Sequence, residues 1–190
     1  PAEEGPVMKK IKESGKLVVG TEAQYAPYEF KDLDANFAGC DMWLAQQIAD
    51  HLGVELEVVD MSFDGIIPAV KSGQVDLGIA AFTITKERME SVDFVSYFTA
   101  GMGYAVAAGN PKNVDENDLC GLNVAVETGT VEEEAINKTA KQCKADGKDA
   151  IDIQSSKLQT DVTTNVVTGK AKEKKISPLM YVLTVLFILK

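Results

Sequence analysis

The sequence predicts an α/β protein made of two lobes. From residue 16 onward, short runs rich in β-branched residues alternate with helical patterns, which is typical of a parallel sheet with crossover helices. The chain has 190 residues, 45% of them hydrophobic, so it can bury the core of one large or two small domains. A stretch rich in glycine and polar residues over 101–121 indicates a boundary near its start. We therefore expect lobe 1 over residues 1–104, lobe 2 over 105–171 with a cleft between the lobes, and an atypical apolar tail over 172–190.

In lobe 1, strand patterns and helix patterns follow one another. "KLVVGTE" (16–22) is the first strand, and "DMWLAQQIADHLG" (41–53) is a helix that ends at Gly53. One stripe of this helix is apolar, and it consists of Leu44, Ala45, Ile48, Ala49 and Leu52. After it come an alternating strand (54–61), a short helix (64–73) and a buried strand (75–82).

Lobe 2 repeats the same alternation after the polar stretch. A strand is expected over "LNVAVE" (122–127) and a helix from about Val131 to Lys144. A second strand, "AIDIQ" (150–154), and a second helix, "LQTDVTTNVVTG" (158–169), complete it. The order predicts a second, smaller parallel sheet.

Charge and histidine content exclude two classes of function. The net charge of −10 and the pI near 4.6 argue against nucleic-acid binding, which relies on clustered Lys and Arg. The three cysteines lack zinc-type spacing and the chain has one histidine, so we expect no metal and no cofactor.

The cysteines also bear on where the protein works. A segment that is predicted to form a strand, a turn and a helix separates Cys120 from Cys143, so the chain can return and bring them together. We expect a disulfide there with Cys40 free, although two buried thiols remain an alternative. A disulfide implies a location outside the cytosol. No signal peptide is visible in the sequence, as expected of a mature form from which it has been removed.

Polar and aromatic residues follow the predicted strands. In open α/β sheets, ligands bind beyond the carboxyl ends of the strands. The residues at those ends are Glu22 to Tyr25, Ser62 and Phe63, Ala80 to Thr83, and Thr128 to Thr130. Thr130 and Glu133 fit a capping box, so backbone N–H groups at that helix start could face an anion. This set indicates a small polar ligand.

Arg88 is the only arginine in the chain, and it lies five residues after Thr83. Lysine supplies the other positive charges, so a single guanidinium suggests a task that needs a planar fork of donors. Binding a carboxylate or a phosphate is such a task. The alternative is a solvated surface arginine.

Several long motifs, in this order, resemble a known family. They are "KLVVGTEAQYAPYEF", "AGCDMWLAQQIADHLG", "SFDGIIPAVKSGQVDLGIAAFTITKERMESVDF" and "GLNVAVETGT". The resemblance, over roughly residues 11–171, is to the polar amino-acid solute-binding proteins of ABC importers. It implies a type II periplasmic-binding-protein clamshell that holds a free L-amino acid between two lobes. "DLCG" and "KQCKADGK" also resemble the members whose two cysteines form a disulfide.

The resemblance implies a role for each site residue. Arg88 would hold the ligand carboxylate bidentately, assisted by the amides of Thr83 and of the helix start after Thr130. Tyr25 and Phe63 would sandwich the aliphatic part of the ligand. Ala81 would offer its carbonyl to the ammonium, and Glu22 lies where the family often selects the side chain. The other expected ligand-binding residues are Ala80, Phe82, Thr128, Gly129, Val131 and Gln159.

The sequence departs from the family after Ala171. Members of the family continue into a strand that ends in an aspartate, which is the usual partner of the ligand ammonium. Their chain then crosses back to complete lobe 1. Here we expect lobe 2 and the return segment to be incomplete. "ISPLMYVLTVLFIL" has fewer than the roughly 20 residues needed to span a bilayer. We expect residues 179–189 to form a substitute strand or to drive self-association. A sequence artefact such as a shifted reading frame is the alternative. Milder departures are Phe82, often Met in the family, and Cys40, often Phe.

The expected function is to bind an L-amino acid and deliver it to the membrane subunits of an ABC permease. We expect no enzymatic activity. A ligand-sensing receptor domain uses the same lobes and is an alternative, as is an enzyme resembling cyclohexadienyl dehydratase, in which Glu22 would be the one carboxylate in the pocket. The implied location is periplasmic or extracellular, including a lipid-anchored position at the cell surface.

Overall fold

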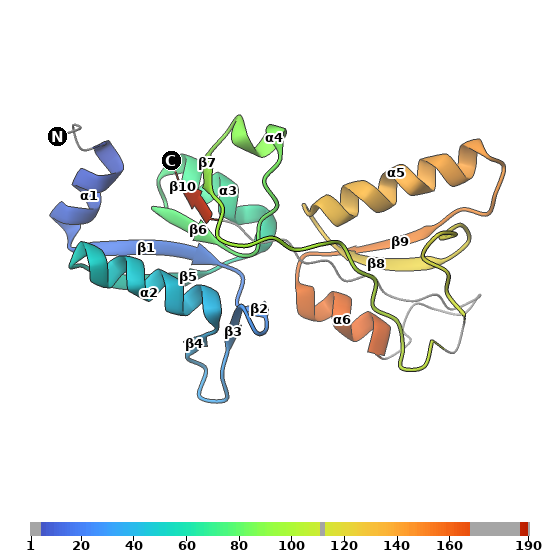
Figure 1. Ribbon diagram of the computed structural model, residues 1–190, viewed down its shortest axis with the longest axis horizontal. Coiled ribbons are helices and arrows are strands. Elements are labelled where there is room, and N and C mark those ends of the chain that lie inside the picture. Colours follow the sequence, from blue (N-terminus) through green and yellow to red (C-terminus); the bar gives the residue numbers. More distant parts are fainter. Residues whose placement is uncertain (1–4, 111–112, 168–186, 190) are drawn as a thin grey trace. The chain divides into compact units, whose positions relative to one another are not determined.

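The structure is a computed structural model that describes residues 5–110, 113–167 and 187–189 (Figure 1). The chain divides into two compact units. Unit 1 comprises the described residues up to Thr99 together with 187–189, and unit 2 comprises those from Ala100 to 167. The change between units therefore lies at Thr99, close to the expected boundary.

Unit 1 is built around a five-stranded sheet with the order β5-β1-β6-β10-β7. Strand β1 (Lys16–Thr21) pairs in parallel with β5 (Glu55–Asp60) and β6 (Leu77–Ile79), as predicted. Strand β10 (Phe187–Leu189) lies between β6 and β7 (Asp93–Val95) and is antiparallel to both (Figure 1). The expectation of a substitute strand is confirmed for these three residues; the rest of the tail, 172–186 and 190, lies outside the described residues.

Helices cover both faces of this sheet. Figure 1 shows α2 (Cys40–Leu52) in front of it and α3 (Phe63–Ser72) behind. Successive side chains of β1 point to opposite faces of the sheet. Leu17 and Val19 belong to the core that includes α1 (Pro6–Ser14) and α2, whereas Val18 packs on the core that includes α3. The predicted stripe of α2 faces that first core, with Ala45 and Ala49 fully buried.

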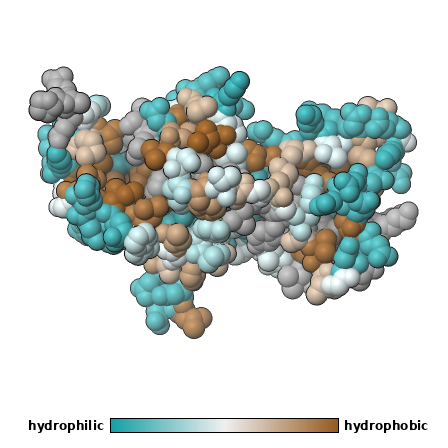
Figure 2. Space-filling view, viewed as in Figure 1, coloured by the Kyte–Doolittle hydropathy of each residue, from teal (hydrophilic) through white to brown (hydrophobic). Residues whose placement is uncertain are grey.

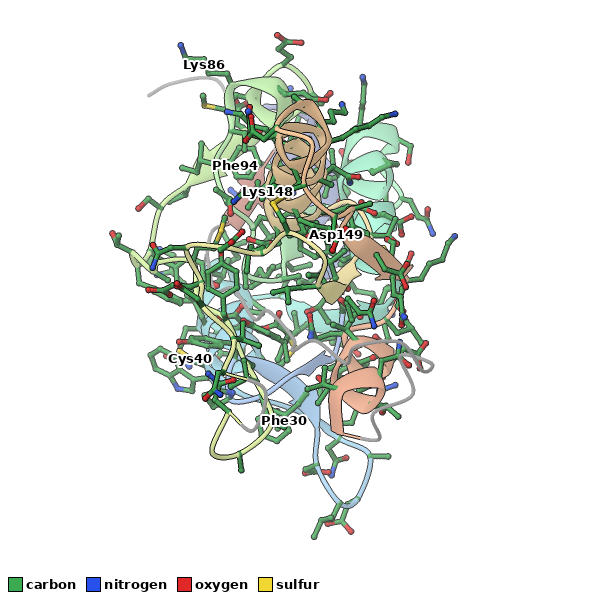
Figure 3. The ribbon with its side chains drawn as sticks, turned by 90° about the vertical axis from the view of Figure 1, so that its right-hand side faces the viewer. Phe30, Cys40, Lys86, Phe94, Lys148 and Asp149 are labelled. Atoms are coloured by element: carbon green, nitrogen blue, oxygen red, sulfur yellow. A yellow bond between two sulfur atoms is a disulfide. The ribbon has the colours of Figure 1, made fainter. Side chains whose placement is uncertain are left out.

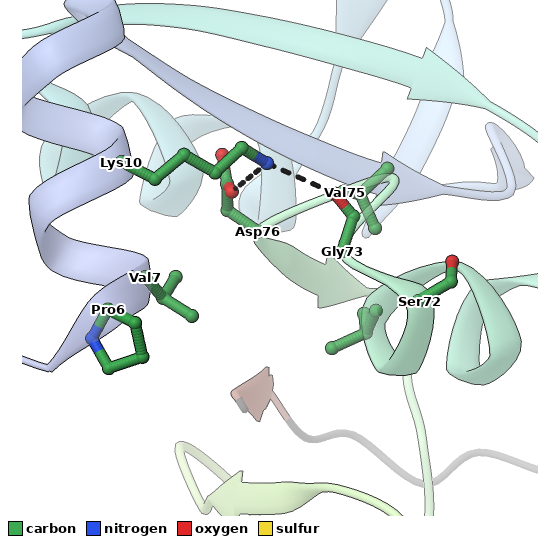
Figure 4. Close-up of a pocket in the computed structure, with 8 residues that line it drawn as sticks. Pro6, Val7, Lys10, Ser72, Gly73, Val75 and Asp76 are labelled. Atoms are coloured by element: carbon green, nitrogen blue, oxygen red, sulfur yellow. Dashed lines mark hydrogen bonds and ion pairs between the residues drawn. The ribbon is translucent and has the colours of Figure 1, made fainter.

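Helix α1 is fixed to the turn between α3 and β6 (Figure 4). The Lys10 ammonium lies 2.8 Å from Asp76 Oδ1 and donates to the Gly73 carbonyl at 3.0 Å. Asp76 Oδ2 in turn accepts the Val18 N–H at 3.0 Å, which connects α1 to β1. A pocket of about 270 Å³ lies at this junction, and no predicted site residue lines it.

A small antiparallel sheet follows β1 and was not predicted. Its strands are β2 (Gln24–Tyr25), β3 (Glu29–Lys31) and β4 (Phe37–Ala38). The turn between β3 and β4 exposes Leu33 fully, and Figure 2 shows hydrophobic atoms at the end of this hairpin. The last segment of unit 1 before β7 is the short helix α4 (Lys86–Met89).

Unit 2 has a two-stranded parallel sheet of β8 (Asn123–Glu127) and β9 (Asp152–Ser156). Val124 and Val126 of β8 belong to the core that includes Ile136 of α5 (Val131–Ala145), whereas Ala125 packs with Val162 of α6 (Gln159–Val167). The outer face of α5 is hydrophilic (Figure 2). The order of strands and helices agrees with the sequence prediction.

The predicted disulfide between Cys120 and Cys143 is confirmed, with a Cα–Cα distance of 5.6 Å. It joins the segment before β8 to the last turn of α5, and Cys143 is part of the core. Cys40 carries a free, exposed thiol, as expected. Among the described residues, no group of three or more His, Cys, Asp and Glu is placed to hold a metal, and no helix is long and apolar enough to cross a membrane.

Candidate ligand-binding site

In unit 1, Arg88 lies over two aromatic rings. Its guanidinium is 5.3 Å from the centroid of Phe82 and 5.6 Å from that of Phe63, and these two rings stack on each other at 4.2 Å. Arg88 Nη1 donates to the Thr83 carbonyl at 2.8 Å. The Arg88 side chain is half-buried. Cation–π contact and a backbone acceptor together fix the plane of the guanidinium.

The local sequence places Arg88 there. Thr85 is the N-cap of α4, and its hydroxyl accepts the Arg88 N–H at 3.1 Å. This cap turns the chain back after the segment that follows β6. Phe82 is buried and therefore anchors the stack, while Thr83 presents its carbonyl to the arginine.

The segment Ala80–Thr83 begins directly after the buried strand β6 and has an unusual backbone conformation. Ala81 has φ +49°, in the left-handed region that non-glycine residues rarely adopt. Ala80 is buried, and Ala81 is half-buried. A strained residue at a strand end reorients the carbonyl and amide that follow, and it is a feature often found at functional sites.

Glu22 and Tyr25 follow the end of β1. Glu22 is only 3% exposed, and its carbonyl accepts the Gln24 N–H at 2.8 Å in the turn that leads to β2. Asp60 Oδ1 accepts the Ala23 N–H at 3.1 Å and so fixes this turn to the end of β5. Tyr25 is half-buried and stacks on Tyr28 at 6.0 Å, while Phe63 stacks on Phe82, so each ring of the expected sandwich has a neighbour within unit 1.

In unit 2, the Thr130 half of the predicted capping box is present at the start of α5, whereas the Glu133 side chain bonds one residue before the N-cap. The Thr130 hydroxyl accepts the Glu133 N–H at 3.2 Å and donates to the Glu127 carbonyl at 2.7 Å. The Glu133 carboxylate returns to accept the N–H of Gly129 at 2.8 Å. The amides of Gly129 and Glu133 are thus engaged by the cap, so the amides of Thr130 and Val131 are the candidates for an anion at this helix start.

Two further predicted residues lie beside this turn or after β9. Thr128 Oγ1 is 2.7 Å from Ser155 Oγ, and the Thr128 N–H donates to the Ser156 carbonyl at 2.9 Å. Gln159 is buried as the first residue of α6. The structure therefore groups the predicted residues into one set at the strand ends of unit 1 and another at those of unit 2.

Sequence reasoning missed a buried polar group beneath Ala81. The Asp41 carboxyl, at the start of α2, lies near the Tyr97 hydroxyl, the Glu29 side chain and the Ala81 backbone, and its two oxygens have no hydrogen-bond partner among the described residues. Asp41 is completely buried and Glu29 is 2% exposed. Burial raises the pKa of the Asp41 carboxyl above its usual range, and it also raises that of Tyr97. An acidic residue in the first turn of a predicted helix was the one available signal for this group.

Residues 17–153 match the family of bacterial extracellular solute-binding proteins, family 3. The chain belongs to this family. Among curated relatives, the arginine-binding protein ArgT of Corynebacterium glutamicum is 33% identical over 90% of this chain and 57% of its own length. A probable histidine-binding protein of Campylobacter jejuni is 33% identical over 86% and 59%. The L-cystine-binding protein TcyJ of Escherichia coli K12 is 35% identical over 74% and 53%.

The chain thus spans less than two thirds of the length of these curated relatives. Solved structures agree on the fold. The ancestral amino acid-binding protein AncCDT-1, a precursor of cyclohexadienyl dehydratase, has a TM-score of 0.83 at 28% identity, covering 96% of this chain and 85% of that one. An ancestral arginine-binding protein bound to arginine has a TM-score of 0.81 at 30% identity, covering 93% and 84%. The predicted α/β fold class of type II periplasmic binding proteins is confirmed. Family membership and the disulfide together place this solute-binding protein outside the cytoplasm.

Proposed function

We propose that this solute-binding protein captures a free L-amino acid and delivers it to the membrane subunits of an ABC importer. The observation that carries the proposal is the guanidinium of Arg88, held over Phe63 and Phe82 and fixed by the Thr83 carbonyl. A planar guanidinium can bind a carboxylate through two parallel hydrogen bonds, which an ammonium cannot do. The α-carboxylate is the group that all free amino acids share.

The neighbours of Arg88 supply the remaining contacts in this proposal. The carbonyl of Ala81 accepts from the ligand ammonium, and the rings of Tyr25 and Phe63 cover its aliphatic part. In unit 2, the amides of Thr130 and Val131 give the carboxylate a second set of donors, and Thr128, Gly129 and Gln159 line the same side. Both sets follow the carboxyl ends of parallel strands, where ligands of open α/β sheets bind, so we propose that the two units close on the ligand as a clamshell.

A basic side chain is the ligand class that we favour. Glu22 brings a buried carboxylate to the end of β1, where its charge would favour a cationic group. Proteins similar to this chain are named for binding arginine, histidine, or lysine, arginine and ornithine.

The finer location and the partners belong to this proposal as well. A periplasmic position, or a lipid-anchored one at the cell surface, lets the protein reach an ABC permease. A sensing domain of a receptor would use the same two sets of residues. The discriminating observation between transport and sensing is a permease gene beside the gene for this chain.

An enzyme is the second candidate, and the likeness to AncCDT-1 favours testing it. Elimination from prephenate or arogenate needs a positioned acid or base, and Glu22 is the one carboxylate in the expected pocket. We propose that the chain is not an enzyme. An assay for phenylpyruvate formation from prephenate and from arogenate checks this, because measurable turnover that is lost in Glu22→Gln would contradict it.

Calorimetry tests the binding proposal. The protein is unfolded and refolded to remove ligand and then titrated with each of the twenty amino acids. Saturable heat is expected with at least one, most strongly with a basic amino acid, and no heat with any of them would overturn the proposal. In Arg88→Lys, binding should weaken by about 2 to 5 kcal/mol, because the ammonium cannot replace the two parallel bonds.

A matched control lies on the same short helix. Lys86 is exposed, and Figure 3 shows its side chain pointing away from the body of unit 1. Lys86→Ala removes a positive charge two residues from Arg88 without touching the aromatic stack. It should leave the affinity unchanged, and equal losses in the two variants would mean that Arg88 acts through general charge alone.

A further inference from the structure

Three polar side chains at the strand ends of unit 2 are joined in one series of hydrogen bonds, which we call the Glu133 chain: Thr128, Ser155 and Glu133. Thr128 follows β8, Ser155 lies in β9, and Glu133 lies in the first turn of α5, elements that are neighbours in Figure 1. Ser155 Oγ is 2.5 Å from Glu133 Oε1 and 2.7 Å from Thr128 Oγ1. Ser155 was not among the predicted site residues, yet it connects a predicted ligand-binding threonine to a carboxylate.

The Glu133 end of the chain fixes which atoms donate. Glu133 Oε2 accepts the Gly129 N–H at 2.8 Å, and Oε1 accepts the Ser155 hydroxyl. A carboxylate has acceptors only, so the hydrogen in its contact with Ser155 belongs to Ser155. A serine hydroxyl has a single hydrogen, and Ser155 therefore cannot donate to Thr128 as well.

The direction of the Thr128 hydroxyl follows from this count. Thr128 must supply the hydrogen of its contact with Ser155. Its hydroxyl also donates to the Ser156 carbonyl at 3.1 Å, and a carbonyl can only accept. In both contacts Thr128 is the donor, so its one hydrogen is directed at β9 while the lone pairs of its oxygen are kept. Toward a ligand at these strand ends, the Thr128 hydroxyl can act only as an acceptor.

Charge strengthens this acceptor. Hydrogen bonds in series polarise one another, so a series that ends on a carboxylate increases the negative character of the Thr128 oxygen. Thr128 is half-buried, which limits screening of that charge by water. A cationic N–H donor is the best partner for such an oxygen, whereas a carboxylate would meet its lone pairs.

We propose that Glu133, acting through Ser155, makes Thr128 a hydrogen-bond acceptor for a cationic N–H group of the bound amino acid. Thr128 contacts the ligand, and Glu133 and Ser155 are positioning residues. This contact rests on the proposed function and deepens it, because it gives unit 2 a preference for a positive group of the ligand. The direction of the hydroxyl groups does not rest on that function.

Neutron diffraction from crystals of the deuterated, ligand-free protein tests the direction. The Ser155 deuterium should lie between Ser155 Oγ and Glu133 Oε1, and the Thr128 deuterium should point to Ser155 or to the Ser156 carbonyl. A Ser155 deuterium directed at Thr128, or a Thr128 deuterium directed away from β9, overturns the proposal whether or not the protein binds an amino acid.

A double-mutant cycle tests whether Glu133 acts through Ser155, with calorimetry of L-arginine binding to the refolded full chain as the readout. In Glu133→Gln the amide oxygen can still accept the Gly129 N–H, so the amide NH₂ faces Ser155 and donates to it. Ser155 then turns its hydrogen toward Thr128, and arginine binding should weaken roughly fivefold. Ser155→Ala breaks the chain, so adding Glu133→Gln to it should cause no further loss.

The same measurements can contradict the positioning role. Unchanged affinity in Glu133→Gln would do so, and so would an equal loss from Glu133→Gln with and without Ser155→Ala, since a role in charge or folding alone does not depend on Ser155. Glu134→Gln, which removes an exposed carboxylate from the next position of α5, is the control and should bind as the unmodified protein does.

Thr128→Val tests the ligand contact, because it keeps the shape of the side chain and removes the oxygen. Arginine binding should weaken about tenfold, and Thr128→Ser, which keeps a hydroxyl, should lose much less. The loss in Thr128→Val should disappear with one of two analogues: citrulline, in which a neutral urea replaces the guanidinium, or guanidinovalerate, which lacks the α-ammonium. A loss that persists with both analogues, or no loss with arginine, overturns the cationic contact. Failure of the unmodified protein to bind arginine contradicts the proposed preference for a basic amino acid and, with it, this contact.

Discussion

Unit 1 builds its core on both faces of a five-stranded sheet, whereas unit 2 packs two helices on a two-stranded sheet and carries the disulfide. Hydrophobic stabilisation grows with the apolar area that a unit can bury, so a smaller core has less in reserve. The small unit adds a covalent link, as small secreted domains commonly do. The same βα pattern is therefore stabilised by burial alone in unit 1 and by a smaller core together with a disulfide in unit 2.

The strand ends of the two units also differ in chemistry. Unit 1 presents side chains, with Arg88 and Glu22 among its charged groups, and unit 2 presents backbone amides and hydroxyls around Thr130. A side chain can select charge and shape, whereas a helix start provides oriented N–H donors for an anion. The proposed function uses both.

The largest effect is expected from removing the strand β10 from the sheet of unit 1. Deleting residues 187–190 removes β10, which pairs along three residues with β6 and along three with β7. With a net value of about 1 kcal/mol for each backbone hydrogen bond, unit 1 should lose roughly 4 kcal/mol of stability. The two unpaired strand edges should also promote self-association.

Hydrogen exchange of the β6 and β7 amides, with sedimentation to follow self-association, measures the effect of this deletion. Removal of Lys190 alone is the control. Equal protection of those amides in the deleted and complete chains would show that β10 contributes nothing to the sheet, and unit 2 should keep its protection in either case.

The next largest effect is expected from removing the disulfide of unit 2. Replacing Cys120 and Cys143 by Ser removes a link between residues 23 positions apart, which the chain-entropy model values at about 3 kcal/mol. The loss should appear in β8, β9 and α5, while unit 1 keeps its stability. Urea unfolding followed by hydrogen exchange in each unit tests this, with Cys40→Ser as the control. A uniform loss in both units would argue that they unfold together.

The sequence predicted those elements whose patterns are local. The stripe on α2 ends at a glycine with φ +67°, and the Thr130 and Glu133 pair marks the start of α5, so both helices were found close to their observed bounds. The lone Arg88 identified the candidate site because its chemistry is distinctive even out of context.

What the sequence did not predict depends on tertiary contacts. Strands β2 and β4 have two residues each, too few for any alternation to be seen. The buried residues Asp41, Glu29 and Tyr97 come from three segments of the chain, and no short-range spacing connects Glu29 with Tyr97. The strand predicted over 75–82 is shorter in the structure, Leu77–Ile79, because the segment after Ala80 turns away at Ala81.

The smallest effect is expected from removing the N-terminal cap of α5, which is also held by the core of unit 2. Thr130→Ala removes the hydroxyl that accepts the Glu133 N–H and should cost about 1 kcal/mol, concentrated in the first turn of α5, because Ile136 still anchors the helix to the core. Thr139→Ala on the same helix removes a hydroxyl that bonds only to the Ala135 carbonyl, and it should be neutral or slightly stabilising, since alanine is the better helix former. Thermal unfolding and exchange of the amides of residues 131–134 distinguish the two variants. Equal effects from both substitutions would mean that the Thr130 cap contributes nothing particular and that the core of unit 2 alone holds the start of α5 in place.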